Sequence, residues 1–431
     1  MAKNFKKVLT YSLMASVMMV VLCSTDSIAK PVLTMFYPTY QTGDIKTEMT
    51  PYAIAMREIF EEFETKYDVK LHVESIAWDQ IDSKLMMTVR AGNPPDISWF
   101  SGQKLAAQVN AGSLMPLDDY VEKYLSEEFI KDLSIVDKES MISVRDGRRY
   151  GFLVSVHSRL LWYRKDLIPE APSTWDDLVK WGQSVAKPEE NFWGFIFYGL
   201  RHYGTIELVV GPFIWANRAR ISDEKGRAVW NTPQVAEAIQ FLSDCVNKYR
   251  ITPRDIVTTA FADMWNSFLA GNAAMTIDGT YYLGAAKQSG LWKEGKIGMT
   301  FIPSPKGDTS ANFSNGWALG VPRGSKQPGL AWKFIEFWQS REVQVKHALV
   351  EGGMPTRRSG WLDPAFSDPV YQFFFMNIEL AGHPMDPLVY YEEALDELAV
   401  VYQDYLLHPE KNLDKMLEEA SRSFNKRYYG S

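Results

Sequence analysis

Residues 91–119, AGNPPDISWFSGQKLAAQVNAGSLMPLDD, constrain the fold more than any other part of the chain. Gly92 can adopt the positive φ that ends a helix, and the two prolines that follow prevent that helix from continuing. Residues 97–100 are few and apolar, which is typical of a central strand covered on both faces. A helix is predicted from about residue 103 to 110. This order of strand, loop and helix predicts a crevice at the carboxyl edge of an open α/β sheet, where ligands usually bind.

The preceding residues lead into this crevice with a regular alternation of elements. The pattern predicts strands over residues 32–37 and 69–76 and helices over residues 52–67 and 78–90. Together with the strand at residues 97–100 this is a β-α-β-α-β run, so we expect a parallel sheet with right-handed crossovers. At 431 residues and 46% hydrophobic composition, the chain exceeds what one core normally holds, and two lobes are expected.

The remaining elements are predicted from the same signals. The pattern indicates strands at residues 149–155, 158–163, 273–277 and 318–321, helices at residues 233–249 and 327–339, and a turn at Asp278-Gly279. Residues 351–358, EGGMPTRR, are punctuated by glycine and proline and are typical of a crossing between lobes.

The first 29 residues are predicted to be a cleaved secretory signal. A basic start precedes an apolar run at residues 8–22 and the small residues before a cleavage point after Ala29. Cys23 raises the alternative of a lipid anchor, but the bulky Leu22 before it disfavours that processing. A periplasmic, exported protein is therefore expected. After cleavage only Cys245 remains, so no intrachain disulfide can form, and its helical context favours a buried apolar role.

Charge and motif content exclude several function classes. The formal net charge is −7, and the signal carries three lysines and one aspartate, so the rest of the chain is still more acidic. The chain therefore lacks the excess of lysine and arginine that would neutralise the phosphates of a nucleic acid, and nucleic acid is not an expected partner. The chain lacks a GxxxxGK[ST] stretch, so it does not hydrolyse ATP by that motif. Its six histidines show no ligand spacing, and no metal or other cofactor is expected.

Several segments together resemble the extracellular solute-binding proteins of bacterial sugar-import ABC transporters, the maltose-binding-protein type. They are residues 91–120, DGRRYGFL with LLWYRKDLI and PSTWDDL, FLAGNAAMTIDGTYY, GWALGVPRGSKQPGLAWKFIEFW and EGGMPTRRS, in the family's order. The resemblance implies a type II periplasmic binding protein fold, in which two doubly wound α/β lobes are joined by three crossings near residues 153–156, 318–321 and 353–356. The first lobe would comprise residues 30–153 and 321–353, and the second residues 154–320 and 354–431.

A sugar site needs aromatic rings for the apolar sugar faces and polar groups for the hydroxyls. The resemblance implies that Tyr281 stacks on sugar and that Phe100 and Gln103 contribute a ring and a polar group. The other candidates lie in loops at the expected sheet edges or near the crossings: Tyr40, Gln41, Thr42, His157, Asp278, Gly279, Asn315, Gly316, Trp317 and Arg357. Trp215, Glu207 and Trp361 are weaker candidates, because many of the 14 tryptophans must serve the cores.

Three of these candidates have open roles. Asp278 accepts from sugar hydroxyls or caps its own turn. Arg357 binds hydroxyls or an anionic group, or forms a salt bridge between the lobes. His157 stands where maltose-type members have a carboxylate, which argues against maltose itself. Phe100→Ala is expected to weaken ligand binding while leaving the unliganded fold largely intact.

The resemblance implies a monomeric, non-enzymatic periplasmic receptor that binds a mono- or oligosaccharide and delivers it to a membrane permease. One alternative keeps the fold but binds a polyol or a glycerol-phosphate-type anion, with Arg357 as its partner. The alternative from another class is a secreted glycoside hydrolase, which needs two carboxylates flanking the bond. The adjacent pairs Asp118-Asp119 and Asp176-Asp177 fall at predicted helix starts, where capping explains them.

Overall fold

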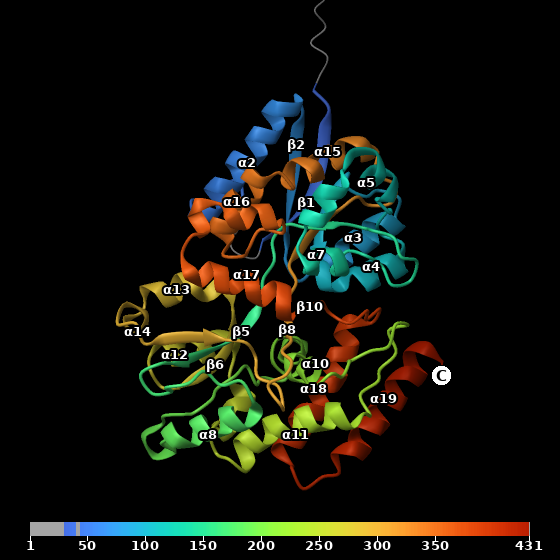
Figure 1. Ribbon diagram of the computed structural model, residues 1–431. Coiled ribbons are helices and arrows are strands. Elements are labelled where there is room, and N and C mark those ends of the chain that lie inside the picture. The colour runs from blue at the N-terminus through green and yellow to red at the C-terminus, as the bar shows by residue number, and fades with distance from the viewer. Residues whose placement is uncertain (1–29, 40–43, 431) are drawn as a thin grey trace, which may run out of the picture.

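The computed structural model describes residues 30–39 and 44–430, which form two lobes, one above the other in Figure 1. The predicted signal, including Cys23 and the cleavage point after Ala29, lies outside the described residues. Cys245 is buried in the second lobe, as expected, and burial raises the pKa of its thiol. Among the described helices, none combines the length and the apolar character that crossing a bilayer requires.

The first lobe opens with the predicted alternation of strands and helices. Its elements are β1 (Val32–Thr39), α2 (Pro51–Tyr67), β2 (Lys70–Ala77), α3 (Ile81–Arg90) and β3 (Ile97–Ser101). β1 pairs in parallel with β2 along its whole length and with β3 on its other side. Helix α2 forms here because Thr50 caps it, accepting from the Ala53 N–H at 3.2 Å, and because its apolar residues recur at the three/four spacing that faces the sheet. The predicted parallel run is therefore confirmed.

Two strands from later in the chain complete this sheet in the order β2-β1-β3-β9-β4. β9 (Trp317–Gly320) pairs antiparallel with β3 and with β4 (Phe152–Leu153). The division made from the sequence placed residues 317–320 in the second lobe, but they form an internal strand of the first. The reason is their apolar character, because Ala318 and Leu319 are completely buried between β3 and β4.

Helices cover both faces of the first-lobe sheet. Besides α2 and α3, the first lobe contains α4 (Leu105–Ala111), which follows a 3₁₀ turn at Gly102–Lys104, α5 (Asp118–Tyr124), α6 (Glu127–Asp132), α7 (Ile135–Ser140), α15 (Pro328–Trp338) and α16 (Arg341–Glu351). The helix predicted at residues 103–110 is thus present, with its first turn tightened. Trp99 from β3 packs edge-on against Tyr37 of β1 and Trp338 of α15, so the side of the sheet opposite Phe100 is an aromatic core.

The second lobe is built on a three-stranded sheet in the order β6-β5-β7. Its strands are β5 (Arg159–Arg164), β6 (Met275–Gly279) and β7 (Ile297–Thr300), and both pairings are antiparallel. Parallel bridges from Trp193 to Ala273 and from Ile196 to Thr276 extend this sheet beyond β6. The expected doubly wound parallel arrangement therefore describes the first lobe better than the second.

Helices surround this second sheet. They are α8 (Trp175–Val185), α9 (Tyr203–Thr205), α10 (Gly211–Ala216), α11 (Pro233–Asn247), α12 (Phe261–Leu269), α13 (Leu283–Gln288), α14 (Gly290–Lys293), α17 (Pro369–Ala381), α18 (Tyr391–Leu407) and α19 (Leu413–Tyr429). A short ladder of β8 (Asn312–Phe313) and β10 (Gly382–His383) lies near the junction of the lobes (Figure 1). The second lobe thus receives its last helices from the end of the chain.

Three crossing segments lie side by side between the lobes. Val156 and Met354 exchange backbone hydrogen bonds of 2.8 Å in both directions, and His157 pairs in the same way with Asn315. Gly316 is required here, because a Cβ at this position would clash with the Ser155 carbonyl oxygen. The crossings therefore act as one hydrogen-bonded hinge.

Candidate ligand-binding site between the lobes

The end of β6 carries a buried carboxylate, Asp278. Asp278 is completely buried, and its Oδ1 accepts from the Gly279 N–H at 2.7 Å and from the Tyr281 hydroxyl at 3.1 Å. Its Oδ2 is buried and has no hydrogen-bond partner among the described residues. Asp278 and Gly279 are strand residues, and the turn predicted there lies at Thr280–Tyr282. One oxygen of this buried carboxylate therefore lacks a donor among the described residues.

Arg159 lies beside this carboxylate on the neighbouring strand. Its position in β5 is opposite Gly279, and its guanidinium carbon lies 4.9 Å from the centre of the Tyr281 ring. Burial raises the pKa of Asp278 to about 7, against the attraction of Arg159. A Cβ at Gly279 would collide with Tyr281 and Arg159, so glycine allows these two side chains to approach the strand.

Glu207 is a second buried carboxylate on the same side of the second lobe. It lies in a π-helical turn, Ile206–Val210, a local irregularity often found at functional sites. Burial raises the pKa of Glu207, and Arg159 and Lys104 oppose that shift. One guanidinium of the second lobe is therefore shared between Asp278 and Glu207, while Lys104 approaches from the first lobe.

Lys104 joins the first lobe to this cluster. Its Nζ lies 2.5 Å from Oε1 of Glu392 in α18 and 3.7 Å from Oδ2 of Asp82 in α3. Asp82 is fixed by hydrogen bonds from the Ser101 hydroxyl, at 2.6 Å, and the Gln108 amide, at 3.1 Å. Lys104 therefore bridges the two lobes across the cleft from a rigid base in the first. We call Lys104, Arg159, Glu207, Asp278, Tyr281 and Glu392 the cleft cluster.

His157 lies in the hinge next to this cluster. Its Nε2 lies 2.7 Å from Oε1 of Glu351 at the end of α16, and its ring meets Tyr281 edge-on at 5.7 Å. Burial alone would raise the pKa of Glu351, but His157 holds it at about 2. The Glu351 carboxylate also accepts from the Gly353 N–H at 3.0 Å. His157 thus links α16, two crossings and the Tyr281 turn.

Phe100 and Gln103 have different positions although both follow the third strand. Phe100 is completely buried, and its ring fills the space over Gly151 and Gly320 inside the sheet. Gln103 is half-buried and lines a cavity of about 840 Å³ between the lobes, together with Asn315. Phe100 is therefore a core residue in this structure, whereas Gln103 and Asn315 line the cavity.

The segment before β9 serves mainly the hinge. The Asn315 side chain accepts from the Gly316 N–H at 2.8 Å, and the Gly316 carbonyl accepts from the Gly102 N–H at 3.0 Å. Trp317 is half-buried and packs against the first-lobe core. Tyr40, Gln41 and Thr42 lie outside the described residues.

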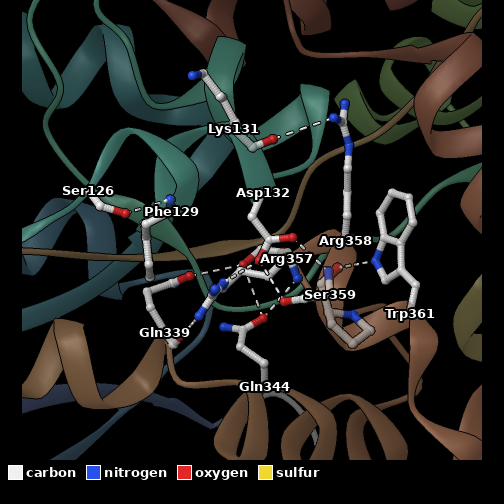
Figure 2. A network of polar contacts seen from close by, with 12 residues as sticks. Ser126, Phe129, Lys131, Asp132, Gln339, Gln344, Arg357, Arg358, Ser359 and Trp361 are labelled. Atoms are coloured by element: carbon white, nitrogen blue, oxygen red, sulfur yellow. Dashed lines mark hydrogen bonds and ion pairs between the residues drawn. The ribbon is translucent and has the colours of Figure 1, made fainter.

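Arg357 is engaged by the protein itself (Figure 2). Its Nε donates to Oδ2 of Asp132 at 2.7 Å, one of its terminal nitrogens donates to the Gln339 carbonyl at 3.2 Å, and its guanidinium lies 4.4 Å from the centre of the Phe129 ring. Of the alternatives left open by the sequence, the ion pair is the one observed. The guanidinium already has protein partners behind the hinge, and a ligand role for Arg357 stays a prediction.

The carboxylate pairs Asp118-Asp119 and Asp176-Asp177, considered as catalytic groups of a hydrolase, lie in the first turns of helices. Asp177 and Thr174 form a capping box at the start of α8, and Asp118 lies in the first turn of α5 and pairs with Arg148 at 3.2 Å. Among the described residues, no group of three or more His, Cys, Asp and Glu side chains could hold a metal ion.

A two-lobed α/β protein with a hydrogen-bonded hinge and a cluster of buried charges at the cleft defines the class of hinged binding proteins. The model of the family described as bacterial extracellular solute-binding protein matches residues 46–345. The chain belongs to this family, and the resemblance stated from its motifs is confirmed.

Individual relatives agree with this assignment. A binding protein of Brucella abortus (strain 2308) is 24% identical over 330 residues, which are 73% of this chain and 77% of that protein. The maltodextrin-binding protein MdxE of Bacillus subtilis (strain 168) is 26% identical over 298 residues, 65% of this chain and 66% of MdxE. The structure of the sugar-binding protein MalE from Xanthomonas citri superimposes with a TM-score of 0.77 at 19% identity, covering 92% of this chain and 96% of MalE. The type of fold inferred from the sequence is therefore confirmed.

Proposed function

We propose that this protein is the substrate-binding component of an ABC importer, and that it binds a carbohydrate between its lobes and delivers it to a membrane permease. The observation that carries the proposal is Asp278, a buried carboxylate with one oxygen that no described residue satisfies, held beside Arg159 and Tyr281 at the cleft. Family membership and the ligands named for MdxE and MalE support it.

The chemistry of the cleft cluster fits hydroxyl groups. Carboxylates accept from sugar hydroxyls, guanidinium and ammonium groups donate to them, and tyrosine rings cover apolar sugar faces. Lys104 lies in the first lobe, whereas Asp278 and Glu207 lie in the second. A ligand that contacts both sets stabilises the closed arrangement by its differential contacts, which is the signal that a permease can read.

The same geometry weighs against the anionic alternative. Arg357, the residue that would have bound a phosphate ester, is paired with Asp132. The cleft cluster has three carboxyl groups against one guanidinium and one ammonium group, so it offers an anion no excess of positive charge. A polyol shares the hydroxyl chemistry and belongs in the same panel of test ligands.

The test is a thermal-shift titration of the mature protein with sugars, polyols and phosphate esters. One carbohydrate class should raise the melting temperature in proportion to ln(1 + [L]/Kd). Asp278→Asn should reduce that shift, and Asp263→Asn, an exposed position on α12, should not. If no carbohydrate raises the melting temperature, the assignment fails. A shift by phosphate esters alone would favour the anion, and turnover of a chromogenic glycoside would favour a hydrolase.

The remaining expectations follow from this proposal. The protein acts in the periplasm after removal of residues 1–29, as a monomer and without enzymatic activity of its own. Its partners are the carbohydrate and the permease subunits. Family membership and the exported character of the family support this location.

A further inference from the structure

The side chain of His157 contacts both lobes from within the hinge. Its Nε2 lies 2.7 Å from Oε1 of Glu351, the last residue of α16 in the first lobe. Its Nδ1 lies 3.5 Å from the Thr280 hydroxyl, and its ring centre lies 5.7 Å from that of Tyr281, both in the turn after β6 in the second lobe. The imidazole therefore connects the end of α16 to this turn.

The backbone around His157 belongs to the hinge as well. His157 exchanges backbone hydrogen bonds of 2.9 and 3.2 Å with Asn315 of the second crossing. In the third crossing, a Cβ at Gly353 would come within 2.5 Å of the Glu351 carboxylate and 3.0 Å of the imidazole, so glycine allows this pair to form there. A change in the pair therefore acts where the three crossings meet.

The carboxylate of the pair keeps its charge over the physiological range of pH. Glu351 is buried, and although burial opposes ionisation, the charge and the hydrogen bond of His157 hold the pKa of Glu351 at about 2. Because the carboxylate accepts, Nε2 of His157 carries a proton and Nδ1 is the nitrogen left to take up a second one. Histidine is the side chain that ordinarily changes charge between about pH 5 and 8. A change of charge in the pair therefore occurs on the imidazole.

On the first-lobe side, a histidine and a tyrosine face the carboxylate. His347 lies one helical turn before Glu351 in α16, and burial lowers the pKa of His347 to about 4. Tyr37 of β1 lies near Glu351, and burial, its contact with Tyr52 and the charge of Glu351 raise the pKa of Tyr37 well above its ordinary value. His347 and Tyr37 therefore stay neutral between pH 5 and 8.

On the second-lobe side, Tyr281 connects the imidazole to two charged groups. The Tyr281 hydroxyl donates to Asp278 at 3.1 Å, and the guanidinium carbon of Arg159 lies 4.9 Å from the centre of the same ring. The guanidinium opposes a positive charge on His157. Burial raises the pKa of Asp278 to about 7, so Asp278 changes charge in the same range of pH. An experiment therefore has to distinguish His157 from Asp278.

We propose that the hinge contains a pH-sensitive switch, in which protonation of His157 turns its hydrogen bond with Glu351 into an ion pair and favours the arrangement in which the lobes are in contact. In this arrangement the imidazole reaches Glu351 on one side and the Tyr281 turn on the other, so the added charge strengthens contacts with both lobes. An equilibrium linked to one proton shifts by at most about tenfold per pH unit.

The switch operates without a ligand. A ligand that binds between the lobes stabilises the same arrangement, so its affinity should also rise as the pH falls. This consequence rests on the carbohydrate binding proposed above, whereas the switch itself can be measured on the ligand-free protein.

The test is small-angle scattering of the ligand-free mature protein at about pH 5 and pH 8. The radius of gyration should be smaller at the lower pH, because the lobes are then held together. His157→Gln keeps an N–H donor for Glu351 but takes up no proton, so this variant should lose the difference in radius. His408→Gln is the matched control, because His408 is exposed and lies 3.6 Å from Glu410 outside the hinge, and it should behave like the wild type.

A second pair of variants separates the possible sites of the proton. Glu351→Gln removes the negative charge of the pair and should also lose the difference, which gives an independent test if His157→Gln does not fold. Asp278→Asn should keep the difference. If Asp278→Asn removes it and His157→Gln keeps it, the proton acts on Asp278 and the proposal is overturned. A radius independent of pH in the wild type also overturns it, and neither result bears on carbohydrate binding, because no ligand is present.

Discussion

Charged side chains at the hinge and at the cleft differ in how completely the protein satisfies their hydrogen bonds. On the hinge side, both oxygens of Asp132 are engaged, by Arg357 at 2.7 Å, by the Ser359 hydroxyl at 2.6 Å and by the Ser359 N–H at 2.8 Å. On the cleft side, Oδ2 of Asp278 and Nε of Arg159 are buried and have no hydrogen-bond partner among the described residues. A structural network is thus complete within the protein, whereas the cleft leaves groups for a ligand to satisfy.

On the hinge side, two glutamine side chains also satisfy backbone carbonyl groups of the crossing segments. Gln339 donates to the Leu153 carbonyl at 2.7 Å and Gln344 to the Val154 carbonyl at 3.3 Å, and both side chains accept from the Thr356 hydroxyl at 3.0 Å. They hold the first and third crossings to the helices of the first lobe. Motion between the lobes is therefore expected beyond residues 154 and 356, and the Lys104–Glu392 ion pair is one contact that opening would break.

Of the substitutions that compare the hinge with the cleft, Phe100→Ala should have the largest effect, a loss of stability. The ring is completely buried over Gly151 and Gly320, although the strand it ends leads directly to the cleft. Removal of a buried phenylalanine side chain should lower the free energy of unfolding by about 3–5 kcal/mol, measured by urea denaturation. Gln103→Ala, three residues on, should change stability by no more than about 0.5 kcal/mol. Equal stabilities for Phe100→Ala and the wild type would return Phe100 to the binding site.

This revises the expectation drawn from the sequence and shows its limit. The apolar run at residues 97–100 correctly predicts a strand buried on both faces, and the glycine and proline signals before it are local. The same burial hides Phe100, and the side chain could not be placed because its neighbours at residues 151 and 320 are far away in the sequence. Local patterns therefore predict elements well and the surroundings of a side chain poorly.

The cleft cluster also shows that sequence patterns do not reveal which distant residues come together. Asp278 lies at the end of a strand and Tyr281 just after it, so both could be found by their position, but Arg159 becomes visible only through the pairing of β5 with β6. Lys104 and Glu392 are 288 residues apart. Glu207 had one available signal, a carboxylate in an apolar stretch, which alone is too weak to assign a role.

Asp132→Ala should have the next largest effect and act on stability alone. Burial opposes ionisation of this carboxylate, yet Ser359 and Arg357 hold its pKa below the ordinary value. Loss of these charge-assisted hydrogen bonds leaves Arg357 without its carboxylate and should cost about 2–3 kcal/mol in the free energy of unfolding. Glu127→Ala removes an exposed ion pair on the same helix and should cost less than about 0.5 kcal/mol. A comparable loss in both variants would mean that the Asp132 network stabilises the protein no more than an exposed ion pair does.

The pH dependence of stability sharpens the contrast at Asp278. Because burial raises its pKa from 3.8 to about 7, the folded state binds more protons than the unfolded state between these values, and stability falls as pH rises. The slope for one proton is at most about 1.4 kcal/mol per pH unit. Asp278→Asn should remove it, so the variant should gain on the wild type by about that amount from pH 5 to pH 6.

The wild type must be compared with Asp278→Asn because other groups also change the stability over a neighbouring range of pH. Burial lowers the pKa of His347 from 6.5 to about 4, which makes stability rise with pH over that range and opposes the Asp278 slope. Glu351, with a pKa of about 2, contributes stability that is lost only as pH falls below 4.5. Both groups are present in the two proteins and cancel in the difference. A difference independent of pH would show that Asp278 is ionised throughout.

Glu392→Gln tests the cleft contact with the smallest expected effect. Its ion pair with Lys104 joins the two lobes, and half of the Glu392 side chain is exposed, so folding should be unaffected. Loss of the pair makes the closed state less favourable, and the ligand must then supply that free energy from its own contacts. We expect about fivefold weaker binding, equivalent to about 1 kcal/mol, and a larger radius of gyration without ligand by small-angle scattering. Glu74→Gln removes a pair with Lys84 inside the first lobe and should change neither quantity. If both variants bind like the wild type and scatter identically, the Lys104–Glu392 pair has no part in closure, and the distinction between hinge and cleft rests on Asp278 alone.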